Sequence, residues 1–121
     1  MSNYFEEEEF ACRCGRPDCD AAEMDRDHVA RLNRARKISG VPYYITSGRR
    51  CAVQNQLVGG SPSSAHLTGH ADDIQAATSR QRYEILRGLI QSGFTRLGIG
   101  KDFLHADDDP ALPPRVVWLY G

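Results

Sequence analysis

Two short segments of the chain contain side chains that can bind a metal ion. Residues 64–73 read SAHLTGHADD, and residues 102–105 read DFLH. Two imidazoles and one carboxylate, from His66, His105 and Asp73, would leave one position of a tetrahedral zinc ion open. An open position allows zinc to activate a water molecule, whereas a structural site is closed by protein ligands. The residue types therefore predict a catalytic Zn²⁺ site.

These ligands must come from different structural elements, because His66 and Asp73 are too far apart in the chain to share one helical turn. We expect a loop to deliver His66, since the glycine- and serine-rich stretch 59–64 precedes it. Residues 71–76 predict a strand that carries Asp73 on one face. His105 lies in the apolar run 103–106, which predicts another strand. We expect the side chain of His105 to project from that strand toward the other two ligands.

Two helices are predicted from capping boxes followed by apolar residues at helical spacing. The first capping box is at residues 20–23, and Gly40 can end the helix that follows. The second is at residues 78–81, and Gly93 can end its helix. The apolar residues expected to face the core are Val29, Leu32, Ala35 and Ile38 in the first helix, and Tyr83, Leu86, Leu89 and Ile90 in the second.

The length of 121 residues and the hydrophobic content of 40% predict one domain that spans residues 1–121. The strands expected are residues 43–46, 71–76, 96–99, 103–106 and 116–120. Together with the helices they predict an α+β fold, in which helices pack on a small, mostly antiparallel sheet.

The same two segments resemble a known family of zinc peptidases. This family comprises the D-Ala-D-Ala carboxypeptidases and L-Ala-D-Glu endopeptidases of bacterial cell walls and phage lysis, including the vancomycin-resistance dipeptidases. Its motif S-x-H-x-x-G-x-A-x-D and its acidic-x-x-His motif are both present in full. The matching residues are Ser64, His66, Gly69, Ala71 and Asp73 in the first motif, and Asp102 and His105 in the second.

The similarity continues in residues 45–50, 59–64 and 117–120, so it covers most of the chain and is greatest for the short, single-domain, phage-associated branch. It implies a fold shared with the hedgehog signalling domain, with zinc as cofactor. It also implies that the substrate is a stem peptide of peptidoglycan, cleaved at a peptide bond.

The resemblance also implies roles for residues around the metal. Asp102 would take a proton from the water and pass it to the departing amine. Asp107 is the alternative candidate for the base. It lies two residues beyond His105, so on a strand it would share the face of that histidine and could act as the base or as a hydrogen-bonding partner of His105. Arg50 occupies the position of the family's active-site arginine and would bind a substrate carboxylate or stabilise an oxyanion. Ser64 would hydrogen-bond substrate near the metal.

The other two histidines are assigned no role at the metal. His70 lies at a variable position of the motif and is predicted to be an exposed neighbour rather than a fourth ligand. His28 lies in a charged helix and is predicted to be a surface or hydrogen-bonded core residue.

Charge and hydropathy limit the partners and the location. A net charge of −1 argues against nucleic acid as a partner, and no apolar run is long enough to span a membrane. The N-terminal residues show no export signal, so the sequence leaves the location of the protein open. A cytoplasmic chain would reach an outside substrate through lysis, on a phage particle, or by a route that the sequence does not specify. We expect a monomer.

Two questions stay open from the sequence. Cys12, Cys14, Cys19 and Cys51 could bind a second zinc ion, form disulfides or remain thiols. The spacing C-x-C-x4-C is not a common zinc-ribbon spacing and favours thiols. The alternative to an enzyme is a binding module that keeps the fold and the metal without turnover, for which a carboxylate at Asp102 would be unnecessary.

Overall fold

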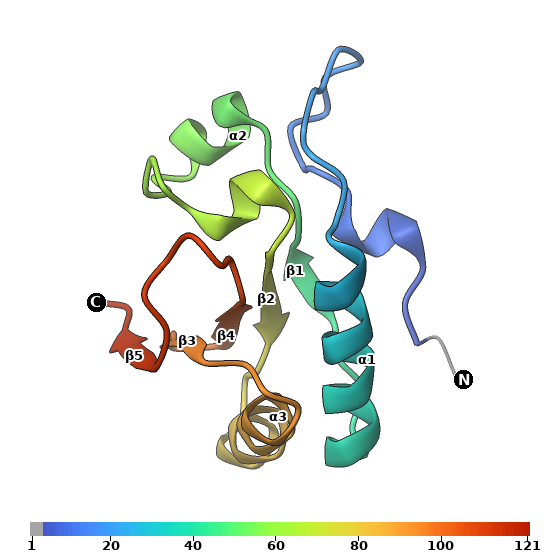
Figure 1. The fold of residues 1–121 in the computed structure, drawn as a ribbon, viewed down its shortest axis with the longest axis vertical. Coiled ribbons are helices and arrows are strands. Elements are labelled where there is room, and N and C mark those ends of the chain that lie inside the picture. Colours follow the sequence, from blue (N-terminus) through green and yellow to red (C-terminus); the bar gives the residue numbers. More distant parts are fainter. Residues whose placement is uncertain (1–3) are drawn as a thin grey trace.

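The computed structural model describes residues 4–121. Its elements, in chain order, are η1 (Glu7–Phe10), α1 (Arg26–Ser39), β1 (Ile45–Ser47), α2 (Ala52–Leu57), η2 (Ala65–Thr68), β2 (Ala71–Gln75), α3 (Ser79–Gln91), β3 (Arg96–Ile99), β4 (Phe103–Asp107) and β5 (Val116–Leu119). The strands form one sheet in the order β1-β2-β4-β3-β5 (Figure 1). All neighbouring strands are antiparallel except β3 and β5, so the mostly antiparallel α+β architecture is confirmed.

The register of the sheet places four positions in one row. Asp73 on β2 lies opposite His105 on β4, which lies opposite Gly98 on β3, which in turn lies opposite Trp118 on β5. Gly98 is required in this row, because a Cβ there would lie 2.5 Å from Nε1 of Trp118. The missing side chain lets the indole ring lean toward His105, and the two ring centroids are 5.3 Å apart.

The hydrophobic core lies on the opposite face of the sheet, where α1 and α3 pack against each other. Ile74 of β2 and Leu104 of β4 are fully buried there. The alternation predicted for residues 71–76 is therefore confirmed, since Ile74 and Ala76 lie in the core while Asp73 faces the other way. None of the helices within residues 4–121 is both long and apolar enough to cross a membrane.

The helix boundaries differ in part from the predicted ones. The capping box predicted at residues 20–23 is wrong, because Asp25 caps α1 by accepting a hydrogen bond from the backbone N–H of His28. Gly40 ends α1 with φ 72°, as expected. The capping box of α3, in which Thr78 and Gln81 exchange hydrogen bonds, is confirmed.

The predicted apolar stripes are also only partly correct. Ile38, Tyr83 and Ile90 are 37%, 67% and 55% exposed, respectively. The helices are rotated relative to the prediction, so that α3 buries Ile85 and Leu89 while α1 buries Leu32, Ala35 and the polar His28. A histidine on the buried face indicates a polar interaction inside the core, which apolar spacing cannot reveal.

Candidate metal centre

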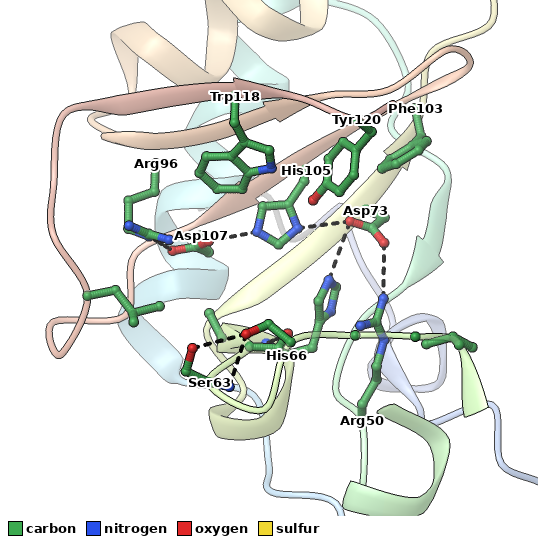
Figure 2. A pocket seen from close by; sticks show the side chains of 17 residues that line it. Arg50, Ser63, His66, Asp73, Arg96, Phe103, His105, Asp107, Trp118 and Tyr120 are labelled. Carbon is green, nitrogen blue, oxygen red and sulfur yellow. Dashed lines mark hydrogen bonds and ion pairs between the residues drawn. The ribbon is translucent and has the colours of Figure 1, made fainter. Parts of the chain in front are cut away.

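The structure brings the three predicted ligands together on the face of the sheet opposite α1 and α3 (Figure 2). His66 comes from η2 rather than from the loop that the sequence predicted, whereas Asp73 and His105 come from β2 and β4 as expected. One potential ligand atom from each residue lies within 4.8 Å of the other two. Such a spacing is suited to a single ion held at a common centre.

His66 is oriented by its backbone neighbours. Its Nδ1 donates to the carbonyl oxygen of Gly48 at 2.5 Å, which leaves Nε2 as the ring nitrogen available to a metal ion. The side chain is 2% exposed, and Nε2 has no hydrogen-bond partner although it lies 3.4 Å from Oδ1 of Asp73. A buried acceptor without a partner is costly, and a metal ion would satisfy it.

The turn that carries His66 depends on the motif's serine and glycine. Ser64 caps η2, and its hydroxyl accepts a hydrogen bond from the backbone N–H of His66 at 3.2 Å. Gly69 ends η2 with φ 76°, and a Cβ at this position would lie 2.1 Å from the carbonyl oxygen of Glu23. Both fixed positions of the motif therefore shape the backbone around the histidine.

His105 is held between two carboxylates. Its Nε2 donates to Oδ2 of Asp107 at 2.6 Å, and its Nδ1 lies 3.0 Å from Oδ1 of Asp73. Burial lowers the pKa of His105, but the hydrogen bonds with Asp107 and Asp73 outweigh burial and leave the pKa raised. Asp107 also accepts from Nε of Arg96 at 2.6 Å, so each of its two oxygens has a partner.

Asp73 is kept ionised by its neighbours. Burial raises the pKa of this carboxyl group, but the hydrogen bond with His105 and the nearby imidazole of His66 hold it far below its usual value. Nη2 of Arg50 lies 3.3 Å from Oδ2 of Asp73. Arg50 is itself fixed by hydrogen bonds to Ser47 and Asn55, both at 3.1 Å. The site therefore contains an anionic ligand and a cationic group that faces the same cavity.

The three candidate ligands line a cleft of about 550 Å³. One wall is aromatic, formed by Phe103, Trp118 and Tyr120 (Figure 2). The opposite wall comes from residues 58–66 and includes Ser64. Sequence reasoning missed this aromatic wall and Arg96. The signal was available, since alternate residues of a terminal strand, such as Trp118 and Tyr120, share one face.

The remaining predicted residues lie around this cleft. Asp102 is exposed and lines an adjoining cavity of about 460 Å³, which also contacts Arg50 and Asp73. Among residues 4–121, no hydrogen bond reaches its carboxylate. His70 is outside the metal cluster and half-buried rather than exposed, and its Nε2 lies 3.6 Å from Asp25.

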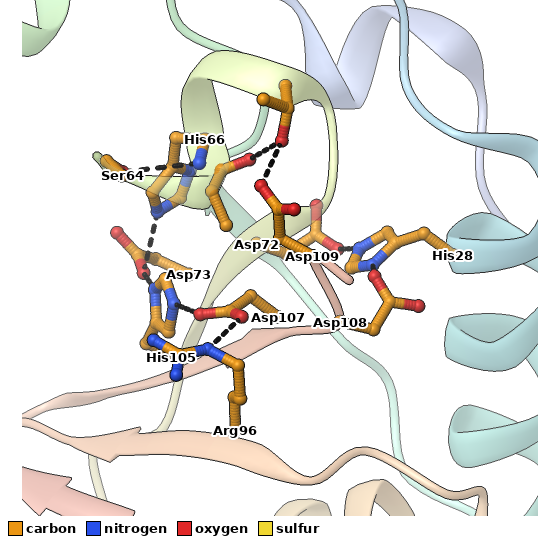
Figure 3. A network of polar contacts seen from close by, with 12 residues as sticks. His28, Ser64, His66, Asp72, Asp73, Arg96, His105, Asp107, Asp108 and Asp109 are labelled. Atoms are coloured by element: carbon orange, nitrogen blue, oxygen red, sulfur yellow. Dashed lines mark hydrogen bonds and ion pairs between the residues drawn. The ribbon is translucent and has the colours of Figure 1, made fainter. Parts of the chain in front are cut away.

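A second polar network lies on the other side of β2 (Figure 3). The ring of His28 bridges Asp72 and Asp108, and Arg31 also pairs with Asp108. Burial lowers the pKa of His28, but the charge of Asp72 and the hydrogen bonds with both carboxylates raise it to about 10. His28 is thus a hydrogen-bonded core residue, one of the two possibilities expected for it.

The chain matches the model of a known protein family. The family model described as Peptidase M15 matches residues 3–107, a range that contains all three candidate ligands. No curated protein matches the chain.

Proposed function

The chain belongs to the peptidase M15 family, whose members are zinc-dependent peptidases, and we propose that it hydrolyses peptide bonds in the stem peptides of peptidoglycan. The observation that carries this proposal is the buried, unpartnered Nε2 of His66, directed at Asp73 beside an open cleft. His66, Asp73 and His105 would hold the zinc ion. When bound, zinc supplies Lewis-acid activation of water and of the peptide carbonyl.

The proton transfers are assigned to Asp102. A general base needs a carboxylate oxygen that is free to accept a proton, and both oxygens of Asp107 already accept hydrogen bonds. Asp102 accepts none among residues 4–121, and its cavity adjoins Asp73. We assign Asp107 the role of orienting His105.

Substrate binding is assigned to Arg50 and Ser64. The guanidinium of Arg50 lines both cavities, so it can bind a substrate carboxylate or the oxygen of the scissile carbonyl. Ser64 lines the cleft from the opposite wall, where its hydroxyl also accepts a hydrogen bond from the backbone N–H of His66. Stem peptides carry free carboxylates and small alanine side chains, which suit a cleft with a cationic end and an aromatic wall.

The proposal is tested by incubating the zinc-loaded protein with purified muropeptides and identifying the products by mass spectrometry. Release of free D-alanine would indicate a carboxypeptidase, and cleavage between L-Ala and D-Glu would indicate an endopeptidase. The matched control is the His66→Ala/His105→Ala variant, which lacks both imidazole ligands. Absence of any cleavage by the zinc-loaded wild type would contradict the proposal and favour a binding module.

A further inference from the structure

The four cysteines of the chain gather at a second place, away from the metal centre. Cys12, Cys14 and Cys19 lie in the loop between η1 and α1, and Cys51 is the N-cap residue of α2. Their four sulfur atoms all lie within 4.8 Å of one another. Cys19 and Cys51 are more than thirty residues apart in the chain, so it is the tertiary fold that brings their sulfur atoms together.

We propose that Cys12, Cys14, Cys19 and Cys51 form a closed structural zinc site. Sulfurs bound to one tetrahedral zinc at about 2.3 Å lie about 3.8 Å apart. The Sγ atoms of Cys12 and Cys51 are separated by 3.7 Å, close to that value and well beyond the roughly 2.0 Å of a disulfide. Four thiolates with no position left for water make a structural rather than a catalytic site.

Backbone N–H groups are directed at three of the four sulfur atoms. The N–H of Cys51 points at Sγ of Cys12 at 3.3 Å, and that of Gln54 points at Sγ of Cys51 at 3.5 Å. The N–H of Arg16 points at Sγ of Cys14 at 3.4 Å. Such hydrogen bonds stabilise negative charge on sulfur and are the usual outer partners of metal ligands.

Apart from its cysteines, the loop is held mainly near its two ends, where Arg13 donates to the carbonyl oxygen of Ile45 and the backbone N–H of Asp25 donates to that of Gly69. Residues 11–25 form no helix or strand, and most of them are exposed. In Figure 1 this blue segment extends beyond the start of α1. A loop of this length without secondary structure needs a specific interaction to keep one conformation. Zinc would tie it to Cys51, the residue that follows Arg50, and so link the loop to the cleft.

The test measures the zinc content of the full chain, purified with a reductant, and uses variants to distinguish zinc at the four cysteines from zinc at His66, Asp73 and His105. The His66→Ala/His105→Ala variant removes the catalytic ligands and is expected to retain about one zinc per chain. Cobalt bound to this variant should show thiolate-to-cobalt charge-transfer absorption. The Cys14→Ser/Cys19→Ser variant should lose that zinc, whereas Asp20→Asn, an exposed change in the same loop, should keep it. These readouts do not depend on peptide hydrolysis.

The alternatives give different results. If the His66→Ala/His105→Ala variant contains no metal and all four of its thiols react immediately with an alkylating reagent, the cysteines are free and the proposal is overturned. If the intact mass of the same variant is lower than that of the reduced chain by two hydrogen atoms for each disulfide bond, the cysteines form disulfides and the proposal is overturned. Iron in place of zinc would overturn the identity of the metal. Because the histidine variant leaves all four cysteines in place, the test stands even if the cysteine variant does not fold.

Discussion

The imidazole of His105 donates its Nε2 proton to Asp107, two residues further along the same strand, at 2.6 Å. Strand alternation makes this contact possible, because residues i and i+2 share a face of the sheet. Nδ1 of the same ring lies 3.0 Å from Oδ1 of Asp73, on the side of the candidate ligands. With a metal ion on Nδ1, the ring would keep its single proton on Nε2, because a carboxylate can only accept this hydrogen bond. Asp107 thereby selects the ring nitrogen that is available to a metal ion.

Replacing Asp107 with asparagine should therefore weaken zinc binding at the centre by about 10- to 100-fold. The asparagine keeps the size of the side chain but removes the charge that stabilises the Nε2–H tautomer. Competition with a zinc chelator measures the change, and Asp102→Asn is the control that should leave the affinity unaltered. An Asp107→Asn protein with wild-type zinc affinity would show that this contact does not position the ligand.

The Asp102→Ala variant should fold and keep its zinc but lose about 100-fold in kcat, the scale expected for a general acid–base group. The neighbouring exposed residue offers a control, since Lys101→Ala should retain normal turnover. Steady-state hydrolysis of a muropeptide, with metal analysis of the same samples, measures both quantities. Near-normal turnover in Asp102→Ala, with the loss in Asp107→Ala instead, would transfer the role to Asp107.

Arg50→Ala should lower kcat/KM by roughly 100-fold, because the guanidinium faces the cleft beside Asp73. A loss in kcat would indicate stabilisation of the oxyanion, and a rise in KM alone would indicate binding of a substrate carboxylate. Arg49→Ala is the matched control, since Arg49 does not line the cleft. Equal losses in the two variants would count against a specific role for Arg50.

The buried His28 should make stability depend on alkaline pH. Its pKa is raised from 6.5 to about 10 in the folded protein, so the folded state holds a proton that the unfolded state releases. This contribution is fully present below pH 6.5 and is lost as the pH rises toward 10. Urea unfolding across this range should show a falling free energy of unfolding.

His28→Gln removes the titrating group, so its free energy of unfolding should vary much less with pH over the same range. His70→Gln should keep most of the wild-type dependence, because the ring of His70 contacts Thr68 and Asp25 and makes no hydrogen bond with His28, Asp72 or Asp108. A wild-type protein whose stability is constant across the range would show that His28 is neutral in the folded state.

Sequence alone was sufficient for the features that depend on local order. The ligand types, their spacing, the strands that carry Asp73 and His105, and the capping box at Thr78 all involve residues close together in the chain. Strand alternation and helix capping operate over only a few residues, so their signals can be read directly. The family motif is of the same kind, because its fixed positions are short segments.

The tertiary structure decided the features that depend on distant partners. Only the register of β2, β4, β3 and β5 places Asp73, His105 and Trp118 in one row, and only the packing of α1 against the sheet brings His28 to Asp72. The approach of Cys51 to the N-terminal cysteines is likewise a product of folding. Each of these contacts joins segments that are far apart in the chain, and the sequence of one segment does not indicate which other segment it contacts. Such long-range proximity depends on the packing of the whole chain.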